Sequence, residues 1–359
     1  MDMFDNKPMD LQKLLAPVWA GDTVYEESFF ALMPRGVTAD DALEIPLLYR
    51  ADEILSVTSA TREITLTEGK DYMLEDGRLI IPAGSSVYRM KWEEYQIIGE
   101  GEDKFPFLCE GGGKIFFGEG DTMHSREYLV TYRHSDGWNG FVPTARACAL
   151  PKTKEKLAKG TPVSFCWFGD SITTGANSSG VIGAAPFIPM FPKLVCMALE
   201  EQYGCEINYV NYAVGGTVSR WGTEKLPEAF AGETPDIMFI AFGMNDASGR
   251  VPKEDFIANI RTMVAQTRAL NPDCEFLLCS TTLPNPMAPT FCCNHATHEP
   301  LLAALCEELG DCAALVPMTS VHLALMKKKR FYDMTGNNIN HPCDFLARIY
   351  AQTILAQFA

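Results

Sequence analysis

Apolar residues beyond residue 160 gather in five short runs, and stretches with a helical period lie between them. The runs are residues 163–168, 207–213, 237–242, 275–280 and 313–317. After Pro252 the apolar residues recur every three or four positions, and residues 344–358 repeat this pattern at the end of the chain. Apolar strands that alternate with helices are typical of a parallel sheet with helices on both faces. We therefore expect an α/β fold for this half of the chain.

The first half of the chain has a different pattern, with short segments rich in Thr, Val, Ile and Tyr between turns. Asp76-Gly77 predicts a hairpin that leads into residues 78–81, and the stretch 126–138 contains another strand that ends at Asp136-Gly137. Evenly spaced strands without a convincing helix favour a β-sandwich, here of a jelly-roll-like kind.

The segment KTKEKLAKGTP, residues 152–162, is charged and turn-rich, so we place a domain boundary there. The predicted organisation is an N-terminal β-sandwich domain over residues 1–155 and an α/β/α domain over residues 156–359. A chain of 359 residues is long enough for both, and its 47% of hydrophobic residues is typical of a globular protein.

The net charge of −16, from 46 acidic and 30 basic residues, argues against nucleic acid or an anionic membrane surface as a partner. The N-terminal sequence has no apolar run of signal-peptide length, and no run approaches the roughly 18 apolar residues of a membrane-spanning helix. The twelve cysteines are scattered through apolar segments, where reduced and buried thiols are expected. We therefore expect a cytoplasmic protein.

Small polar blocks follow the apolar runs, at the edge of a parallel sheet where ligands bind. The first run leads into Gly169-Asp170-Ser171, the second into Gly215-Gly216, and the third into Gly243-Met244-Asn245-Asp246. His341 lies in the segment before the final helix. Parallel strands end at the same edge of a sheet, so these blocks are expected to converge.

The residue types in these blocks fit one reaction. Ser171 is a candidate nucleophile, and His341 is a candidate base that would take its proton and later return it to a leaving alcohol. The backbone N–H groups of Ser171 and Gly216 and the side-chain amide of Asn245 could stabilise the oxyanion of a tetrahedral intermediate.

Each block also has a simpler interpretation when taken alone. Ser171 could be a helix N-cap, Asn245 and Asp246 could be turn residues, the glycine pair a bend, and His341 a surface residue. A phosphate-binding loop is disfavoured, because GDSITTG lacks the lysine and the glycine spacing of a Walker motif. The occurrence of all four blocks in order favours the catalytic interpretation.

This combination resembles the SGNH hydrolases, also called GDSL esterases, over residues 163–359. The resemblance implies a flavodoxin-like three-layer fold with a five-stranded parallel sheet, and ester hydrolysis through an acyl-enzyme without a metal or other cofactor. It also assigns Asp170 and Asp246 to supporting positions. Ser171 does not lie in a G-x-S-x-G elbow, which disfavours the α/β-hydrolase fold.

One position departs from that family. Its members usually have an aspartate three residues before the histidine, where this chain has Asn338. A β-domain before such a site is similar to the family 2 carbohydrate esterases, some of which use a Ser–His dyad. We consider Asn338, a backbone carbonyl or Asp344 as the acceptor that orients His341, although Asp344 could instead cap the final helix. The prediction is a dyad oriented by neutral acceptors.

The expected substrate is a small acyl ester, acetyl first, on a carbohydrate. Trp221 and Phe291 are candidate substrate-binding residues, and the loop 281–300 around Phe291 is expected to wall the site. The alternatives are a lipase, lysophospholipase or thioesterase with the same residues, and a carbohydrate-binding protein whose esterase site has decayed. Neither nucleic acid nor a membrane is expected as a partner, and an oligomer remains open.

Two further stretches are discounted as sites. CCNHATH places Cys292, Cys293, His295 and His298 close together, but adjacent cysteines seldom bind one tetrahedral zinc and no second ligand pair has the right spacing. The basic run 327–330 is expected to be a solvated helix end.

Overall fold

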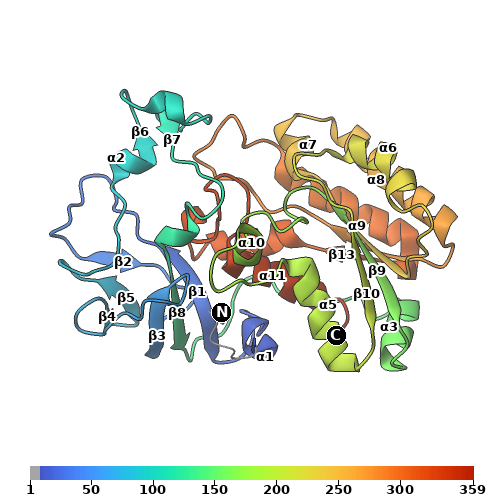
Figure 1. The fold of residues 1–359 in the computed structure, drawn as a ribbon, viewed down its shortest axis with the longest axis horizontal. Coiled ribbons are helices and arrows are strands. Elements are labelled where there is room, and N and C mark those ends of the chain that lie inside the picture. Colours follow the sequence, from blue (N-terminus) through green and yellow to red (C-terminus); the bar gives the residue numbers. More distant parts are fainter. Residues whose placement is uncertain (1–8) are drawn as a thin grey trace, which may run out of the picture.

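A computed structural model describes residues 9–359, which form a β-rich half and an α/β half side by side (Figure 1). The two halves correspond to the two sequence patterns. In the described part of the chain, no helix combines the length and the apolar character needed to cross a membrane.

The α/β half contains one five-stranded sheet, as predicted. Its strands are β9 Val163–Gly169, β10 Ile207–Asn211, β11 Ile237–Ala241, β12 Glu275–Cys279 and β13 Ala313–Val316. The spatial order is β10-β9-β11-β12-β13 and every neighbouring pair is parallel. Counted from β9 this is the flavodoxin-like order 2-1-3-4-5, in which the order reverses at the first strand.

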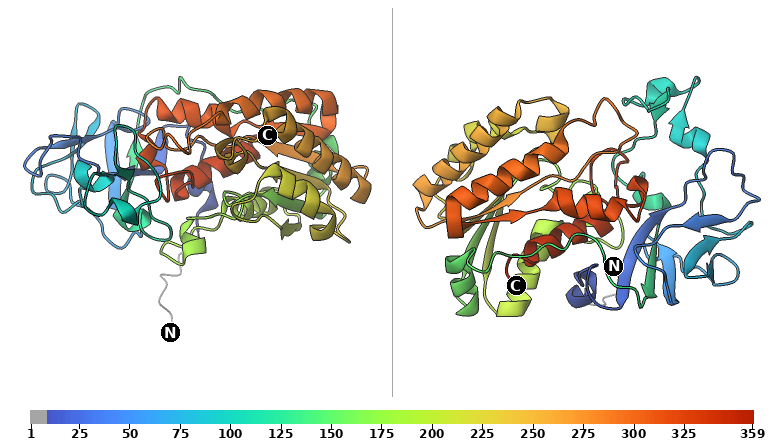
Figure 2. Two further views of the ribbon diagram at one scale, coloured as in Figure 1. Left: turned by 90° about the horizontal axis from the view of Figure 1, so that it is seen from above. Right: turned by 180° about the vertical axis from the view of Figure 1, so that it is seen from behind.

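Helices cover both faces of this sheet (Figures 1 and 2). The α/β half contains α3 Pro151–Ala158, α4 Ser179–Ile182, α5 Phe191–Tyr203, α6 Ser219–Ala229, α7 Met244–Ser248, α8 Lys253–Leu270, α9 His298–Leu309, α10 Met318–Met326 and α11 Asp344–Leu355. Phe165 and Trp167 of β9 pack in one apolar cluster with α5 and α11, whereas Cys166 and Phe168 pack in another with α6, α8 and α9. This alternation explains why the whole strand is apolar.

The N-terminal half consists of small antiparallel sheets and short helices. Its elements are α1 Leu11–Leu14, β1 Thr23–Phe30, β2 Leu43–Ile45, β3 Glu53–Ser59, β4 Met73–Glu75, β5 Arg78–Ile81, α2 Trp92–Tyr95, β6 Gln96–Ile97, β7 Lys114–Ile115 and β8 Glu127–Arg133. The sheet orders are β1-β8-β3, β2-β5-β4 and β6-β7. The predicted hairpin is present, because Glu75 pairs with Arg78 across the Asp76-Gly77 turn. Val57 of β3 and Leu79 of β5 lie in one apolar cluster, so the two larger sheets share a core.

The charged segment 152–162 is not a linker, since its first part forms helix α3. Pro151 stands at the start of this helix, and the next two N–H groups, of Lys152 and Thr153, donate to the buried carboxylate of Glu275 at 2.9 and 2.8 Å. A carboxylate at a helix N-terminus satisfies donors that have no partner within the helix. The boundary at residue 155 remains a prediction.

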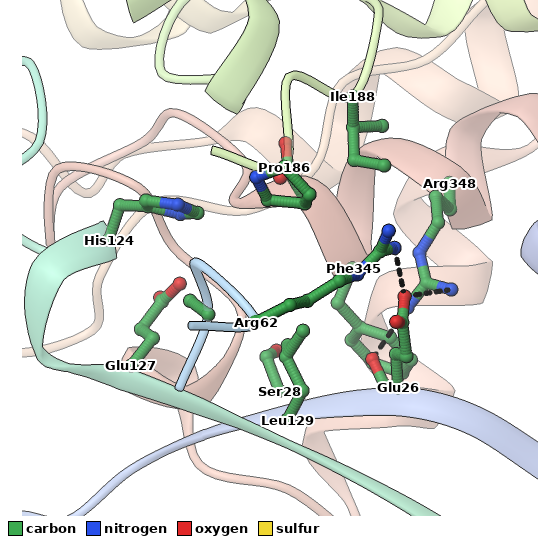
Figure 3. A pocket seen from close by; sticks show the side chains of 12 residues that line it. Glu26, Ser28, Arg62, His124, Glu127, Leu129, Pro186, Ile188, Phe345 and Arg348 are labelled. Carbon is green, nitrogen blue, oxygen red and sulfur yellow. Dashed lines mark hydrogen bonds and ion pairs between the residues drawn. The ribbon is translucent and has the colours of Figure 1, made fainter. Parts of the chain in front are cut away.

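The two halves share an apolar core through helix α11, which lies between the N-terminal strands and the parallel sheet (Figure 1). The buried guanidinium of Arg348 on α11 donates to the carbonyls of Tyr25 and Glu26 in β1, at 3.2 and 2.6 Å. Arg348 and Glu26 also line a small pocket to which both halves contribute (Figure 3). The N-terminal half is therefore docked by hydrogen bonds as well as by apolar packing.

A buried ion pair also joins the halves, and it corrects the interpretation of the basic run 327–330. Nζ of Lys329 lies 2.6 Å from Oε1 of Glu27, and both side chains are 0% exposed. The Glu27 carboxylate also accepts hydrogen bonds from the Tyr132 hydroxyl at 2.7 Å and the Leu48 N–H at 3.0 Å. Lys329 is therefore a buried contact and not part of a solvated helix end.

We predict that Lys329→Met lowers the free energy of unfolding by about 3–5 kcal/mol, because it leaves the Glu27 carboxylate buried without its counter-ion. Urea unfolding measures this difference. Lys327→Met is the matched control, since Lys327 is exposed, and it should change stability by at most about 0.5 kcal/mol. The double variant Glu27→Gln, Lys329→Met should recover part of the loss. Equal midpoints for the two single variants would contradict the prediction.

Candidate active site

The sequence blocks meet at the carboxyl edge of the parallel sheet, where the strand order reverses. Ser171 follows β9, Asn245 lies in α7 just after β11, and these two strands are neighbours in the sheet. His341 arrives from the loop before α11, and its Nε2 lies 2.9 Å from the hydroxyl oxygen of Ser171. The structure thus brings the predicted nucleophile and base into hydrogen-bond contact.

A tight turn places Ser171 at this edge. Gly169 must lack a side chain, because a Cβ there would lie 2.4 Å from the Ala241 carbonyl oxygen and 2.4 Å from Oγ1 of Thr173. Residues 170–177 continue as turns, and the next helix, α4, begins only at Ser179. Ser171 is therefore not a helix N-cap, which excludes its simplest alternative role.

Asp170 stabilises the turn that carries Ser171. Its carboxylate is buried and accepts the Ile172 N–H at 3.0 Å, while its carbonyl accepts the N–H groups of Thr173 and Thr174 at 3.1 Å each. Burial raises the pKa of the Asp170 carboxyl to about 7, and the hydrogen bond from Ile172 opposes this shift only in part. Asp170 supports the geometry of Ser171 from within the core.

Three N–H groups in the sequence blocks at this edge of the sheet have no hydrogen-bond acceptor among the described residues. Two are the backbone N–H groups of Ser171 and Gly216, neither of which donates to another described residue. The third belongs to Asn245, whose side-chain amide donates one hydrogen to the Thr217 carbonyl at 2.9 Å and keeps the other. Cβ of Ser171 and the position that a Cβ on Gly215 would take are 3.6 Å apart, so the glycine turn passes close to the nucleophile. This set fits the expected oxyanion donors.

Asp246 connects the Asn245 turn to the glycine turn. Its carboxylate has no exposure and accepts the Ser219 N–H at 3.0 Å on each oxygen, at the start of α6. Burial raises the pKa of the Asp246 carboxyl, and the bonds from Ser219 lower it in part. Asp246 therefore fixes the spacing between two blocks that carry oxyanion donors.

The loop that carries His341 is organised by Asn337. The Asn337 side-chain oxygen accepts three backbone N–H groups, those of Ile339, Asn340 and His341, at 3.0, 3.0 and 3.1 Å. The carbonyl of His341 in turn accepts the Gly336 N–H at 2.8 Å. Such closure by an asparagine side chain is common in tight turns. It fixes the position of the His341 backbone, from which the imidazole extends.

The other ring nitrogen of His341 faces two acceptors that the sequence analysis did not identify. Nδ1 lies 2.7 Å from Oδ1 of Asn177 and 3.3 Å from Oε2 of Glu119. Asn177 lies six residues after Ser171 in the same polar stretch, which is a signal that could have identified it. Glu119 stands between two glycines in the N-terminal half, and no periodicity marks it.

Neither residue proposed as the orienting acceptor contacts the ring. The Asn338 side chain accepts the Tyr95 hydroxyl at 3.1 Å and donates to the Phe116 carbonyl at 2.8 Å. Asp344 does not cap its own helix either, because its carboxylate accepts the Ser179 N–H of α4 at 2.8 Å. The orienting group therefore comes from elsewhere in the chain, and a carboxylate is present beside the neutral amide that the dyad hypothesis requires.

The two candidate substrate-binding aromatic residues have different surroundings. Trp221 packs on Phe168, with ring centroids 5.5 Å apart, in the cluster beneath α6, so core packing accounts for its ring. Phe291 meets Phe107 of the N-terminal half edge to face at 5.8 Å, and Phe107 meets Phe117 in the same way at 5.1 Å. Phe291 therefore lies where the two halves meet. Phe117, which belongs to the same group of rings, stands two residues before Glu119 in the chain.

The histidines of the CCNHATH stretch are packed inside the α/β half. Nε2 of His295 lies 3.1 Å from the Met244 carbonyl oxygen, and the His298 ring stacks on Phe256 at 4.0 Å. Burial lowers the pKa of both imidazoles to about 4. Within residues 9–359 no group of three His, Cys, Asp or Glu side chains has the arrangement of a metal site.

Comparison with known proteins finds similar sequences and structures. Residues 167–342 match the GDSL-like lipase/acylhydrolase family. A curated arylesterase of Vibrio mimicus is 27% identical over 97 residues, which cover 27% of this chain and 44% of that protein.

Two solved structures show lower similarity. A two-domain esterase (CEX) active on acetylated mannans has 18% identity and a TM-score of 0.49, over 61% of this chain and 54% of that one. The acetylxylan esterase Axe2 of Geobacillus stearothermophilus has 19% identity and a TM-score of 0.45, over 55% of this chain and 94% of that one. The chain thus spans about half the length of the arylesterase and of the two-domain esterase. On the family match and the order of its sequence blocks, the α/β half resembles the GDSL-like lipase/acylhydrolase family.

Proposed function

We propose that this protein is a serine esterase that hydrolyses small acyl esters. The observation that carries the proposal is the 2.9 Å contact between the Ser171 hydroxyl and Nε2 of His341, at the carboxyl edge of the sheet. The N–H groups of Ser171 and Gly216 and the Asn245 amide support it, because donors without partners beside a nucleophile suit an oxyanion. A site that had lost its activity would not be expected to retain both this Ser–His contact and these donors.

The proposed reaction has two matching stages. The Ser171 oxygen attacks the acyl carbon while its proton passes to Nε2 of His341, and the carbonyl electron pair moves onto the oxygen as an oxyanion. Collapse of this intermediate breaks the bond to the alcohol, which takes the proton from Nε2. Water then attacks the acyl-enzyme with the same proton transfers, which releases the acid and restores Ser171.

We further propose a short acyl group, acetyl first, on a carbohydrate. The segment after the nucleophile is densely packed, since a Cβ on Gly175 would lie 2.3 Å from Cβ of Met190, and both Ser178 and Ser179 are fully buried. This packing favours a small acyl group. The rings of Phe107, Phe117 and Phe291 are partly exposed at the junction of the halves, and aromatic rings of this kind suit the apolar faces of sugars.

We predict that Ser171→Ala lowers kcat by on the order of 10⁶-fold on an acetyl ester while the melting temperature stays near that of the wild type. A fluorophosphonate probe should label the wild type, and peptide mapping should place the label on Ser171. Substantial turnover by the purified variant, or a label on another serine, would show that Ser171 is not the nucleophile.

Asn245→Ala is predicted to lower kcat by roughly 10²–10³-fold with little change in KM, because an oxyanion forms only along the reaction path. Steady-state kinetics on the same ester separates the two constants. Asn208→Ala, at an exposed position of β10, is the matched control and should behave as wild type. An effect of Asn245→Ala on KM alone would mean that this amide binds the substrate and does not serve the oxyanion.

We predict a preference for short acyl chains. On nitrophenyl esters of rising chain length, kcat/KM should be greatest for acetyl and fall steadily toward octanoyl, because the packed segment leaves little room beyond the nucleophile. Acetylated oligosaccharides should then be deacetylated faster than the acetyl nitrophenyl ester at equal concentration. Faster turnover of octanoyl esters would instead favour a lipase or thioesterase.

A further inference from the structure

The His341 ring is held between the two halves of the chain. Nε2 faces Ser171, whereas Nδ1 faces Asn177 of the α/β half and Glu119 of the N-terminal half. A general base of this kind needs its outer nitrogen bound to an acceptor, and it gains from a negative charge when it becomes an imidazolium. Here two residues divide these tasks.

Asn177 supplies the acceptor. Its side-chain nitrogen donates to the carbonyls of Gly120 and Gly336 at 3.2 and 3.1 Å, so its oxygen must be the atom that faces Nδ1. Gly336 permits this approach, because a Cβ there would lie 2.5 Å from Cβ of Asn177. The arrangement places the hydrogen on Nδ1 and leaves the lone pair of Nε2 toward Ser171. A neutral amide does not, however, offset the charge of an imidazolium.

Glu119 supplies that charge. Its Oε2 lies 3.3 Å from Nδ1, and its Oε1 accepts the side-chain N–H of Asn337 at 3.0 Å. Burial raises the pKa of the Glu119 carboxyl, but hydrogen bonds from His341, Asn337 and Asn177 outweigh this and lower it. The side chain is 52% exposed, so solvent weakens its field but does not remove it.

The position of Glu119 depends on contacts between the halves. The side-chain N–H of Asn338 donates to the Phe116 carbonyl at 2.8 Å, and Asn177 holds the Gly120 carbonyl on the other side of Glu119. Further along this segment, Nε2 of His124 lies 2.7 Å from the Ala185 carbonyl oxygen, beside the pocket in Figure 3. An aspartate at position 338 could not donate to Phe116. The asparagine there therefore suits an arrangement in which the carboxylate comes from another segment.

We infer that Glu119 is a positioning residue of the proposed esterase, and that the N-terminal half thereby completes the active site. The inference rests on the proposed function, because Glu119 acts only through His341. When the Ser171 proton passes to Nε2, the imidazolium lies between Ser171 and the Glu119 carboxylate, while Asn177 keeps the ring in register. In a Ser-His-Asp triad one aspartate both binds the histidine and supplies the negative charge. Here the amide of Asn177 binds the ring, and the carboxylate of Glu119 in the N-terminal half supplies the charge.

The test is Glu119→Gln, which keeps the size of the side chain and removes its charge. Because Asn177 still fixes the tautomer, kcat on an acetyl ester should fall about tenfold, well short of the roughly 10⁴-fold loss that follows substitution of a triad aspartate, and KM should change less than about twofold. The acidic limb of the pH profile of kcat/KM should move to lower pH, since the carboxylate favours the protonated ring and the amide does not. A residue with a purely structural role would not shift this limb.

Asp121→Asn is the matched control. It removes one negative charge from the same segment, and the Asp121 side chain is exposed and makes no hydrogen bond or ion pair with another described residue. This variant should keep the wild-type kcat and pH profile, and both variants should keep the wild-type melting temperature.

The outcomes separate the two proposals. If Ser171→Ala is inactive while Glu119→Gln has the wild-type kcat and acidic limb, the esterase stands and the role of Glu119 is wrong. Equal shifts in Glu119→Gln and Asp121→Asn would likewise overturn it, because the effect would then come from net charge alone. If Ser171→Ala retains activity, the proposed function itself fails.

Discussion

A histidine that removes a proton from a serine must keep its outer ring nitrogen bound, and most of the candidate site follows from how this chain meets that requirement. The loop 335–341 contains no carboxylate, so the acceptors for His341 come from Asn177 and Glu119. Asn337 closes the loop and holds Glu119, and Asn338 holds the Phe116 carbonyl in the same segment. The α/β half thus uses its amides to fix part of the N-terminal half against the ring.

A contact of 3.3 Å between two halves of a chain requires that they do not move freely. Three features of the interface provide this constraint: a shared apolar core, the Glu27–Lys329 ion pair, and the bonds from Arg348 to the carbonyls of β1. Breaking a buried pair is costly, which favours one relative placement of the halves. The N-terminal half is on this account a structural requirement of the site and not an independent appendage.

The sequence predicted the sheet and the convergence of Ser171 with His341, because apolar strands and polar strand ends are local patterns that topology brings together. It did not identify Glu119, since a glycine-flanked loop residue has no periodicity and its importance depends on docking. The acceptors Asn338 and Asp344 were wrong for the same reason: sequence proximity to His341 says nothing about which way a side chain turns. Lys329 was misjudged because the sequence does not distinguish one buried lysine from the other basic residues of the same run.

The most direct test of the account is the protonation of the His341 ring, measured by long-range ¹H–¹⁵N correlation on histidine-labelled protein and assigned by comparison with His341→Gln. The account predicts that neutral His341 carries its hydrogen on Nδ1, bound by Asn177 and Glu119, with Nε2 free to accept the Ser171 proton. A hydrogen on Nε2 would contradict it, because that nitrogen could not then act as the base.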